Sequence, residues 1–171
     1  LPDRQALAPY LAQLDHNRHY SNFGPLNNVL ESRIADIFAE HGAYPLHVTT
    51  TSSATLGLEL VLSSLDLPPG SKVIVPALTF VASLTAIIRA GYTPVIADID
   101  PDSWLLTPEI ATEAAVQTGA RAVLAVAAFG QPQDTKRWSH FQQQSGIRVL
   151  IDAAGAFGSQ WVEAPDIPVV Y

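Results

Sequence analysis

The sequence predicts an α/β protein, a three-layer fold in which a mainly parallel sheet carries helices on both faces. Two observations predict this class. Between residues 47 and 151, short apolar runs typical of buried strands alternate with segments of helical periodicity. The segments between successive runs are long enough for the right-handed crossover helices that join parallel strands. We therefore expect at least five strands in one sheet, with helices covering both of its faces.

The composition of the 171 residues excludes several classes of protein. With 48% apolar and 15% charged residues, the chain should bury a globular core and not stay disordered. A net charge of −7 and a pI near 5.0 lack the basic excess of a nucleic-acid surface. No apolar run approaches the roughly 18 residues of a membrane span, so we expect neither nucleic acid nor a membrane as a partner. The absence of cysteine excludes disulfides and thiolate zinc sites, and it fits a reducing, cytoplasmic location.

Two groups of metal-ligand residue types lack the spacing of a metal site. Asp98, Asp100 and Asp102 alternate like calcium ligands, but the Gly and Glu of an EF-hand do not follow them. We predict a solvated acidic turn there. His16 and His19 lie three residues apart without a third ligand nearby. No metal site is therefore expected.

The N-terminal part predicts two helices separated by a polar loop. Residues 3–14 place apolar side chains on one side of a helix. Residues 26–41 repeat that pattern before Gly42, a residue suited to end a helix. The residues between these helices, 15–25, are polar and close with a Gly-Pro pair, which predicts a loop.

The stretch from His47 to Leu62 predicts a strand, a turn and a helix that together form an anion site. Residues His47 to Thr50 are rich in β-branched side chains and predict a short strand. Hydroxyl-bearing residues follow, and from Ala54 onward apolar residues recur with helical spacing. The first N–H groups of such a helix lack partners and, with the helix dipole, favour a bound anion, most often phosphate. The alternative is that Ser52 or Ser53 only caps the helix.

The rest of the chain alternates in the same way. Further strands are predicted at residues 72–75, 93–97, 121–127 and 147–151. Further helices are predicted at residues 79–89, from residue 107 onward and at residues 135–144. Thr79 is predicted to cap the first of these helices, and Thr107-Pro108-Glu109 to begin the second.

Three strand ends carry residues that together describe one ligand site, because ligands bind at the carboxyl ends of parallel strands. The first is the turn of Ser53, Ala54 and Thr55. The second is Phe80, four residues past a strand end, which would offer a flat ring; its alternative role is in the core. The third is Asp152, which follows an apolar strand and precedes small residues. Its carboxylate should be partly buried and need a cationic or donor partner, unless it is a helix N-cap.

Several stretches of the chain resemble one enzyme family. They are VTTTSSATLGLELVLSSLDLPPGSKVIVPALTFVASLTAIIRAGYTPVIADIDPDSWLLTPE, AFGQPQD, VLIDAAGAFG and, near the N-terminus, YSNFGPLNNVLESRIADIF. Each is similar to the DegT/StrS-type aminotransferases, the fold-type-I enzymes that use pyridoxal 5′-phosphate (PLP) to aminate nucleotide-linked keto-sugars. The similarity spans residues 20–160 in family order. It implies a PLP-dependent transaminase that takes a keto-sugar and an amino acid donor.

The resemblance assigns roles to matching positions. Ser53-Ala54-Thr55 resembles the family's Ser-Gly-Thr cup for the cofactor phosphate, with Ala54 in place of Gly, which is tolerable if that residue keeps a negative φ. Phe80 matches the aromatic residue that stacks on the pyridine ring. Asp152 matches the acid that pairs with the pyridinium nitrogen. Gly155 stands where the family often has Gln or His on the phenolic oxygen side.

The lysine that forms the Schiff base is absent from the matching part of the chain. By the family's spacing it would fall beyond Tyr171, and neither Lys72 nor Lys136 matches its position. We therefore expect residues 26–171 to be a partial PLP-binding large domain, truncated before the lysine. Residues 1–25 would then form an N-terminal helix and a substrate-facing loop. This segment alone should not transaminate.

The resemblance also bears on assembly. The resemblance implies a homodimer whose sites take residues from both subunits, with the loop of Asn22, Phe23 and Gly24 near a cofactor site. Two other interpretations of the function are compatible with the sequence. One is a catalytically silent or regulatory relative without the lysine, and the other is a nucleotide-binding α/β domain, although no G-x-G-x-x-G follows the first strand.

Overall fold

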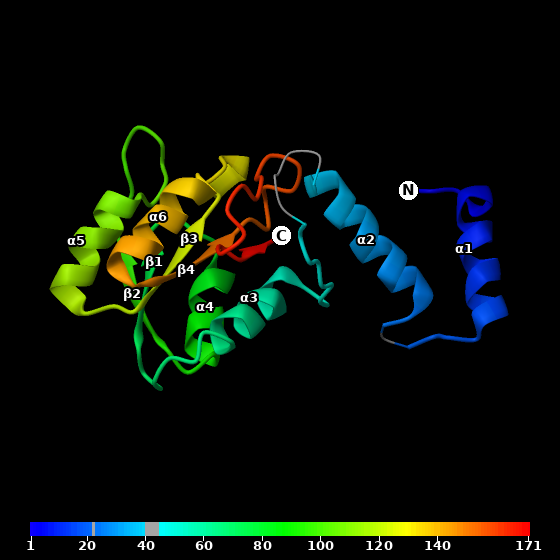
Figure 1. Ribbon diagram of the computed structural model, residues 1–171, viewed down its shortest axis with the longest axis horizontal. Coiled ribbons are helices and arrows are strands. Elements are labelled where there is room, and N and C mark those ends of the chain that lie inside the picture. The colour runs from blue at the N-terminus through cyan, green and yellow to red at the C-terminus, as the bar shows by residue number, and fades with distance from the viewer. Residues whose placement is uncertain (22, 40–44) are drawn as a thin grey trace. The chain divides into compact units, whose positions relative to one another are not determined.

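A computed structural model describes residues 1–21, 23–39 and 45–171, which form two compact units, residues 1–50 and 51–171. The helices are α1 (Arg4–Asn17), α2 (Pro25–Ala39), α3 (Ala54–Ser63), α4 (Val81–Arg89), α5 (Pro108–Thr118) and α6 (Thr135–Ser145), with a 3-10 turn η1 at Ala128–Gly130 (Figure 1). The strands are β1 (Lys72–Pro76), β2 (Thr93–Ala97), β3 (Ala122–Val126), β4 (Arg148–Asp152) and β5 (Val169–Val170). No helix within the described part of the chain is long and apolar enough to cross a membrane.

The larger unit is built on one parallel sheet with the order β2-β1-β3-β4-β5. Each pairing of neighbours is parallel, which confirms the predicted fold class. The chain passes from β1 outward to β2 and then returns to place β3 on the other side of β1. This reversal between β1 and β3 is a topological switch point, where α/β sheets of this kind bind their ligands.

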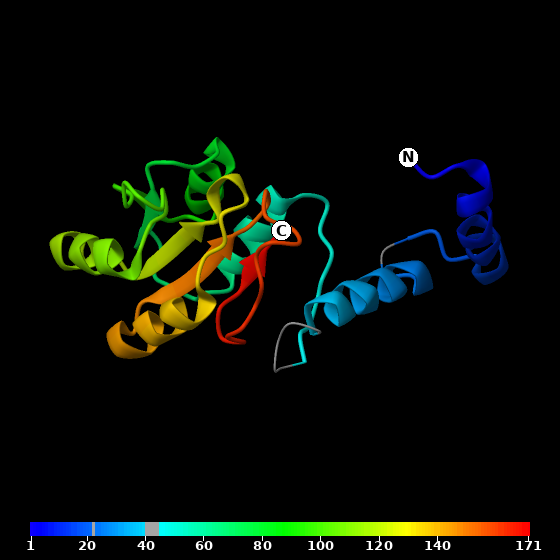
Figure 2. The same ribbon diagram turned by 90° about the horizontal axis from the view of Figure 1, so that it is seen from above.

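Helices cover both faces of the sheet, α3 and α4 on one side and α5 and α6 on the other (Figures 1 and 2). Successive strand residues point to opposite faces, so each strand contributes to both cores. On the side of α3 and α4 the buried strand residues are Val73, Val75, Ala122, Leu124, Val126, Leu150 and Val170. On the side of α5 and α6 they are Ile74, Ala97, Val123, Ala125, Val149 and Ile151. Burial on both sides explains why these strands are continuous apolar runs without polar alternation.

The predicted strand at His47–Thr50 is wrong. These residues form no strand, and Thr50 is instead fixed against α2 within the smaller unit. The Thr50 N–H and hydroxyl donate to Glu31 Oε1 at 2.7 and 2.9 Å, and the hydroxyl also lies 2.7 Å from Asn27 Oδ1. The fifth strand is β5, which sequence analysis did not predict because two residues carry no periodicity. The predicted helix stop at Gly42 lies outside the described residues.

Helix starts follow the predicted capping in two of three cases. The hydroxyls of Ser53 and Thr107 accept the N–H groups of Leu56 and Ile110 at 3.2 and 3.4 Å, which caps α3 and α5. The predicted cap by Thr79 is wrong. Phe80 occupies the cap position of α4 without a side-chain bond, because the Thr79 hydroxyl lies against another side chain.

One glycine sets how closely α3 approaches the sheet. Gly57 is buried in the middle of α3, where a Cβ would lie 2.9 Å from Val170 Cγ1 and 3.3 Å from Thr51 Oγ1. The first distance is too short for a real contact. A glycine is therefore required for α3 to rest against β5 at this separation.

Candidate functional site

A cavity of about 550 Å³ opens where β1, β3 and β4 end. The residues that line it are Ala54, Thr55, Leu58, Leu78, Thr79, Phe80, Ala82, Val126, Ala127, Ala128, Phe129, Asp152, Ala154 and Gly155. They come from the start of α3, the β1–α4 connection and the ends of β3 and β4. The cavity thus lies at the switch point between β1 and β3, and it brings together Thr55, Phe80 and Asp152 as the sequence predicts.

Asp152 is the last residue of β4 and is 6% exposed. Its Oδ2 accepts the Ser83 hydroxyl at 2.7 Å, and its Oδ1 accepts the Ala154 N–H at 3.1 Å. Turns and not a helix follow β4, so Asp152 does not cap a helix. The expected buried carboxylate with hydrogen-bond donors is confirmed.

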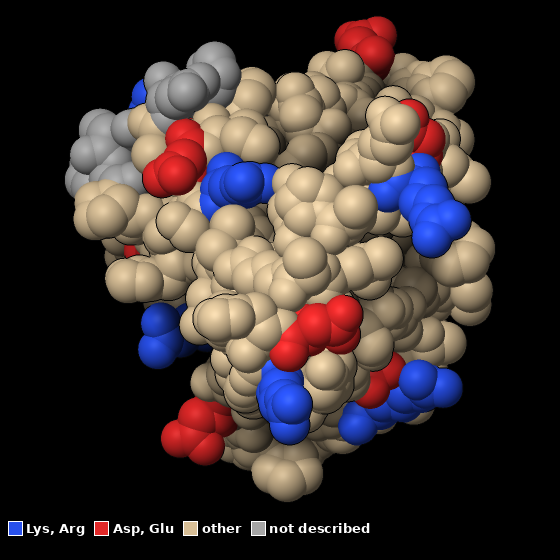
Figure 3. All heavy atoms as spheres, turned by 90° about the vertical axis from the view of Figure 1, so that its right-hand side faces the viewer, with Lys and Arg blue, Asp and Glu red and all other residues tan. Residues whose placement is uncertain are grey.

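No cation within the described part of the chain pairs with this carboxylate. The ion pairs among the described residues are Arg89–Glu59, Lys136–Glu163 and Arg137–Glu109. In each pair, at least one of the two side chains is more than half exposed. On the face drawn in Figure 3, basic and acidic side chains lie interspersed among uncharged ones. A buried carboxylate held only by neutral donors retains much of its desolvation cost. A ligand that presents a positively charged group to Asp152 would offset that cost.

The start of α3 forms another wall of the cavity. Ser53 caps the helix through Leu56 N–H, and its carbonyl accepts Gly57 N–H at 3.0 Å. The N–H groups of Ala54 and Thr55, both lining residues, are left for a ligand. Ala54 is the first residue of α3, and it is not one of the described residues with positive φ. An alanine is therefore tolerated at this position. Capping and anion binding are therefore compatible, because the cap uses a different N–H group.

Two phenylalanine rings stand on the cavity wall. Phe80 is 76% exposed, so the alternative that it belongs to the core is wrong. Phe129, in η1, is 85% exposed and has φ 53, and its ring meets Trp104 edge to face at 6.5 Å between centroids. Sequence reasoning did not select Phe129, because a phenylalanine carries no signal for left-handed backbone geometry.

Gly155 lines the same cavity. A Cβ added there would meet no heavy atom within 4 Å, so the space beside it is open. A larger side chain at this position would project into the cavity without displacing any described atom. The chain therefore leaves room where the resemblance implies a Gln or His contact.

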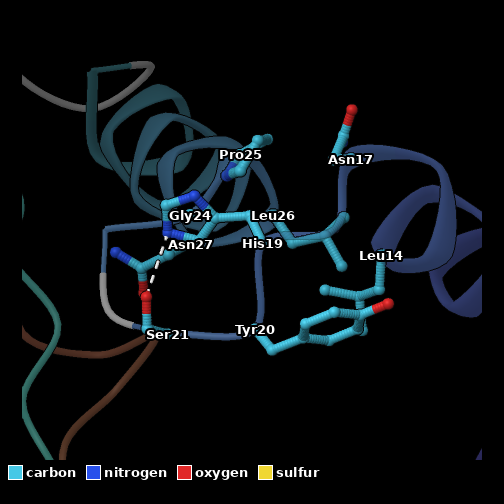
Figure 4. Close-up of a pocket in the computed structure, with 9 residues that line it drawn as sticks. All are labelled: Leu14, Asn17, His19, Tyr20, Ser21, Gly24, Pro25, Leu26 and Asn27. Atoms are coloured by element: carbon cyan, nitrogen blue, oxygen red, sulfur yellow. Dashed lines mark hydrogen bonds between the residues drawn. The ribbon is translucent and has the colours of Figure 1, made fainter.

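The N-terminal loop has its own small cavity, of about 180 Å³, within residues 1–50. Figure 4 shows the lining residues, with His19 Nε2 and Ser21 Oγ 3.4 Å apart. Gly24 is buried, and a Cβ there would lie 2.9 Å from His19 Cδ2, whereas Phe23 is 76% exposed. Asn22 lies outside the described residues. The expectation that this loop faces a cofactor site stays a prediction.

The fold and the cavity define a class of protein. At its switch point, a doubly covered parallel sheet carries a cavity lined by the first residues of α3 and by a buried carboxylate that forms no ion pair with the described residues. These features are typical of α/β domains that bind small molecules at the switch point of the sheet. A family model of the DegT/DnrJ/EryC1/StrS aminotransferase family matches residues 3–165. The chain belongs to this family.

Solved structures of similar chains support the same assignment. DesI, determined in the presence of its TDP-sugar product, is 34% identical over 91% of this chain, with a TM-score of 0.77. The synthase of 3-amino-5-hydroxybenzoic acid is 26% identical over 99%, with a TM-score of 0.80. NtdA from Bacillus subtilis, with bound cofactor PMP, is 25% identical over 86%, with a TM-score of 0.72. This chain spans 38%, 44% and 32% of their respective lengths.

Proposed function

We propose that this chain forms the cofactor-binding part of a PLP-dependent aminotransferase whose acceptor is a keto-sugar, linked to a nucleotide, and whose donor is an amino acid. The observation that carries the proposal is Asp152. It is a buried carboxylate without a cation among the described residues, and it shares one cavity with the free N–H groups of α3. PLP carries a phosphate and a ring nitrogen that takes a proton, so both of its charges would find an opposite charge in this cavity.

Each residue of the cavity then has a defined task. The N–H groups of Ala54 and Thr55 bind the phosphate at the positive end of the α3 dipole. Asp152 holds a proton on the ring nitrogen through a charge-assisted hydrogen bond. Phe80 covers one face of the ring and excludes water from it. The cofactor itself supplies an electron sink for the substrate carbon, which a protonated ring strengthens.

The lysine that would form the Schiff base with PLP is not among the residues that line this cavity. Lys72 Nζ donates to the Thr118 carbonyl at 2.9 Å, and Lys136 pairs with Glu163 at 2.9 Å. Neither lysine lines the cavity. In the whole protein, another part of the enzyme would supply the lysine.

The substrate class rests on relatives whose products differ. DesI is described with a TDP-sugar product, and it has the highest identity of the three structures above. The synthase that makes 3-amino-5-hydroxybenzoic acid has the highest TM-score of the three. We favour a nucleotide-linked keto-sugar, and the cyclic keto acid precursor of an aminobenzoate is the second candidate. We also propose a cytoplasmic homodimer in which the loop of Asn22, Phe23 and Gly24 contributes to substrate binding.

The test uses the intact protein. PLP is titrated while its absorbance is followed, and the loaded protein is then given amino acid donors with a TDP-keto-sugar or a cyclic keto acid, with products identified by mass. Amination of the sugar supports the proposal, and amination of the keto acid alone supports the second candidate. PLP binding without amination of either would indicate a catalytically silent relative. Binding of a nucleotide without PLP would refute the cofactor assignment.

A further inference from the structure

A chain of hydroxyl groups leads from the wall of the cavity to Asp152. Ser83, fully buried on α4, has its Oγ 2.7 Å from Asp152 Oδ2. Thr79 Oγ1 lies 2.7 Å from the same Ser83 oxygen, and Thr79 lines the cavity. The arrangement of these two hydroxyls bears directly on how Asp152 is held.

The directions of these hydrogen bonds follow from the Ser83 hydroxyl, which donates to Asp152 Oδ2. A carboxylate can only accept, so the single hydroxyl proton of Ser83 is committed to Asp152. Ser83 can then only accept from Thr79, and the Thr79 proton points toward Ser83. The Phe80 carbonyl, 3.3 Å from Thr79 Oγ1, is the weaker of the two acceptors by distance. The positions of both hydroxyl protons, those of Ser83 and Thr79, are therefore assigned.

The two donors to Asp152 come from separate parts of the fold. Ala154 belongs to the turn directly after β4, whereas Ser83 lies 69 residues before Asp152 in the sequence. Each holds a different carboxylate oxygen, so rotation of the carboxylate would break both bonds. The cap residue of α4 is Phe80, and Ser83 follows within the first turn of that helix. The bond to Ser83 thus ties the carboxylate to the helix that presents the ring-covering phenylalanine.

We propose that Ser83 is a positioning residue, whose hydroxyl fixes the Asp152 carboxylate in the orientation that accepts the protonated ring nitrogen of the cofactor, with Thr79 supporting it from the cavity wall. The inference rests on the proposed function, because it assumes that PLP is the ligand. It predicts that the hydroxyl affects binding only through the ring nitrogen. A merely structural role would affect every ligand of the cavity alike.

The test compares two ligands in the intact protein: PLP and an analogue of PLP whose ring nitrogen is replaced by carbon. Dissociation constants for both are measured by titration for the parent and for Ser83→Ala. We expect the preference for PLP over the analogue to fall about tenfold in Ser83→Ala, the scale of one hydrogen bond to a charged group. The affinity for the analogue should stay unchanged. Ser83→Thr, which keeps the hydroxyl, should restore the preference.

Thr85→Val is the matched control. Its hydroxyl lies on the same helix and donates only to the Ala82 carbonyl at 3.1 Å, so its removal should leave the preference unchanged. Thr79→Val tests the outer hydroxyl without touching the buried serine, and it should lower the preference by a smaller factor. The second variant keeps the inference testable if Ser83→Ala does not fold.

The outcomes separate this inference from the proposed function. A parent protein that binds PLP no better than the analogue refutes the role of Asp152, and with it both proposals. A parent that prefers PLP, together with a Ser83→Ala variant that keeps this preference, refutes the positioning role alone. Equal losses of affinity for both ligands would also refute it, because they indicate a structural effect on the whole cavity.

Discussion

Asp152 and Asp100 accept the same kinds of hydrogen bond in different surroundings. Each takes one backbone N–H and one serine hydroxyl: Ala154 and Ser83 for the first, and both groups of Ser103 for the second. The donors of Asp100 lie three residues away, at 2.7 Å each, and they close a turn. One donor of Asp152 lies 69 residues away and anchors the carboxylate beside a cavity.

The difference shows what distinguishes the candidate ligand-binding carboxylate from a carboxylate that closes a turn. Both carboxylates accept a backbone N–H and a serine hydroxyl, so these bonds do not distinguish the two residues. The Ser103 bonds hold the pKa of Asp100 below its usual value, and this stabilises a turn without creating a site for a ligand. Asp152 differs because it is buried at a strand end, faces a cavity and has no cation near it within the described chain. The position in the fold thus distinguishes the two carboxylates.

The largest effect should come from replacing Asp152, and not Asp100, by asparagine. In the intact protein, Asp152→Asn should lower the transamination rate about a hundredfold or more, because the lost interaction holds a proton during the reaction. PLP binding should weaken by about tenfold or more, because the bond to the ring nitrogen is lost, but saturating PLP should still load the protein, since the start of α3 is untouched. Asp100→Asn is the matched control and should keep the parental rate. Steady-state kinetics with the cofactor bound measure both, and a parental rate for Asp152→Asn would break the comparison.

The second effect concerns Phe80, which shares a cavity with Asp152 and not with Asp100. Phe80→Ala should weaken PLP binding by about 1 kcal/mol of lost stacking, or roughly fivefold. The free energy of unfolding should change little, because the ring is 76% exposed. Phe80→Trp keeps an aromatic face and should bind PLP nearly as the parent does. Fluorescence titration checks both variants, and unaltered binding in Phe80→Ala would place the ring away from the ligand.

Ser53 tests whether a hydroxyl at the cavity behaves like the local serine of Asp100 or like the distant serine of Asp152. As a helix cap, its loss in Ser53→Ala should lower the free energy of unfolding by about 1 kcal/mol. PLP affinity should hold if the phosphate is bound, as proposed, by the N–H groups of Ala54 and Thr55. Urea unfolding and PLP titration measure the two quantities. A loss of affinity with unchanged stability would assign the hydroxyl to the phosphate.

The smallest effect is the pH dependence that Asp100 contributes. Its pKa is lowered from 3.8 by the Ser103 bonds, so the folded state favours the charged carboxylate. This stabilisation is fully present above the unfolded pKa and is lost as the pH falls through the lower, folded value. The difference in free energy of unfolding between the parent and Asp100→Asn should therefore shrink as the pH drops below about 4. A difference that grows with acidification would contradict the assignment.

Elements defined by an apolar run are the ones that could be predicted from the sequence. The strands β1 to β4 are buried on both faces and therefore are continuous apolar runs in the sequence. Asp152 could be predicted for the same reason, since it interrupts such a run at its end. Residues His47 to Thr50 have strand-like composition, but Glu31 and Asn27 satisfy Thr50 instead, and that contact is invisible in the local pattern.

The parts of the site that escaped prediction depend on contacts distant in sequence or on unusual backbone angles. Ser83 is an unremarkable helical serine until the fold brings it 2.7 Å from Asp152. Phe129 lines the cavity and has φ 53, a value that phenylalanine rarely adopts and no composition rule predicts. The short strand β5 forms because it pairs with β4 at Ile151–Val169 and Asp152–Val170, and not because of its own propensity.

The contact between Gly57 and Val170 has a consequence for the order of events during synthesis. All the residues of the cavity lie between positions 54 and 155, yet α3, which bears the proposed phosphate site, rests on a residue at position 170. A ribosome releases the chain from the N-terminus, so the cavity walls emerge before the surface that seats one of them. The nascent chain would therefore acquire cofactor affinity in a late step, as Val170 joins the sheet. Ribosome-bound nascent chains arrested at successive lengths would show this step as a rise in PLP retention. Equal retention by chains that end before β5 would argue against it.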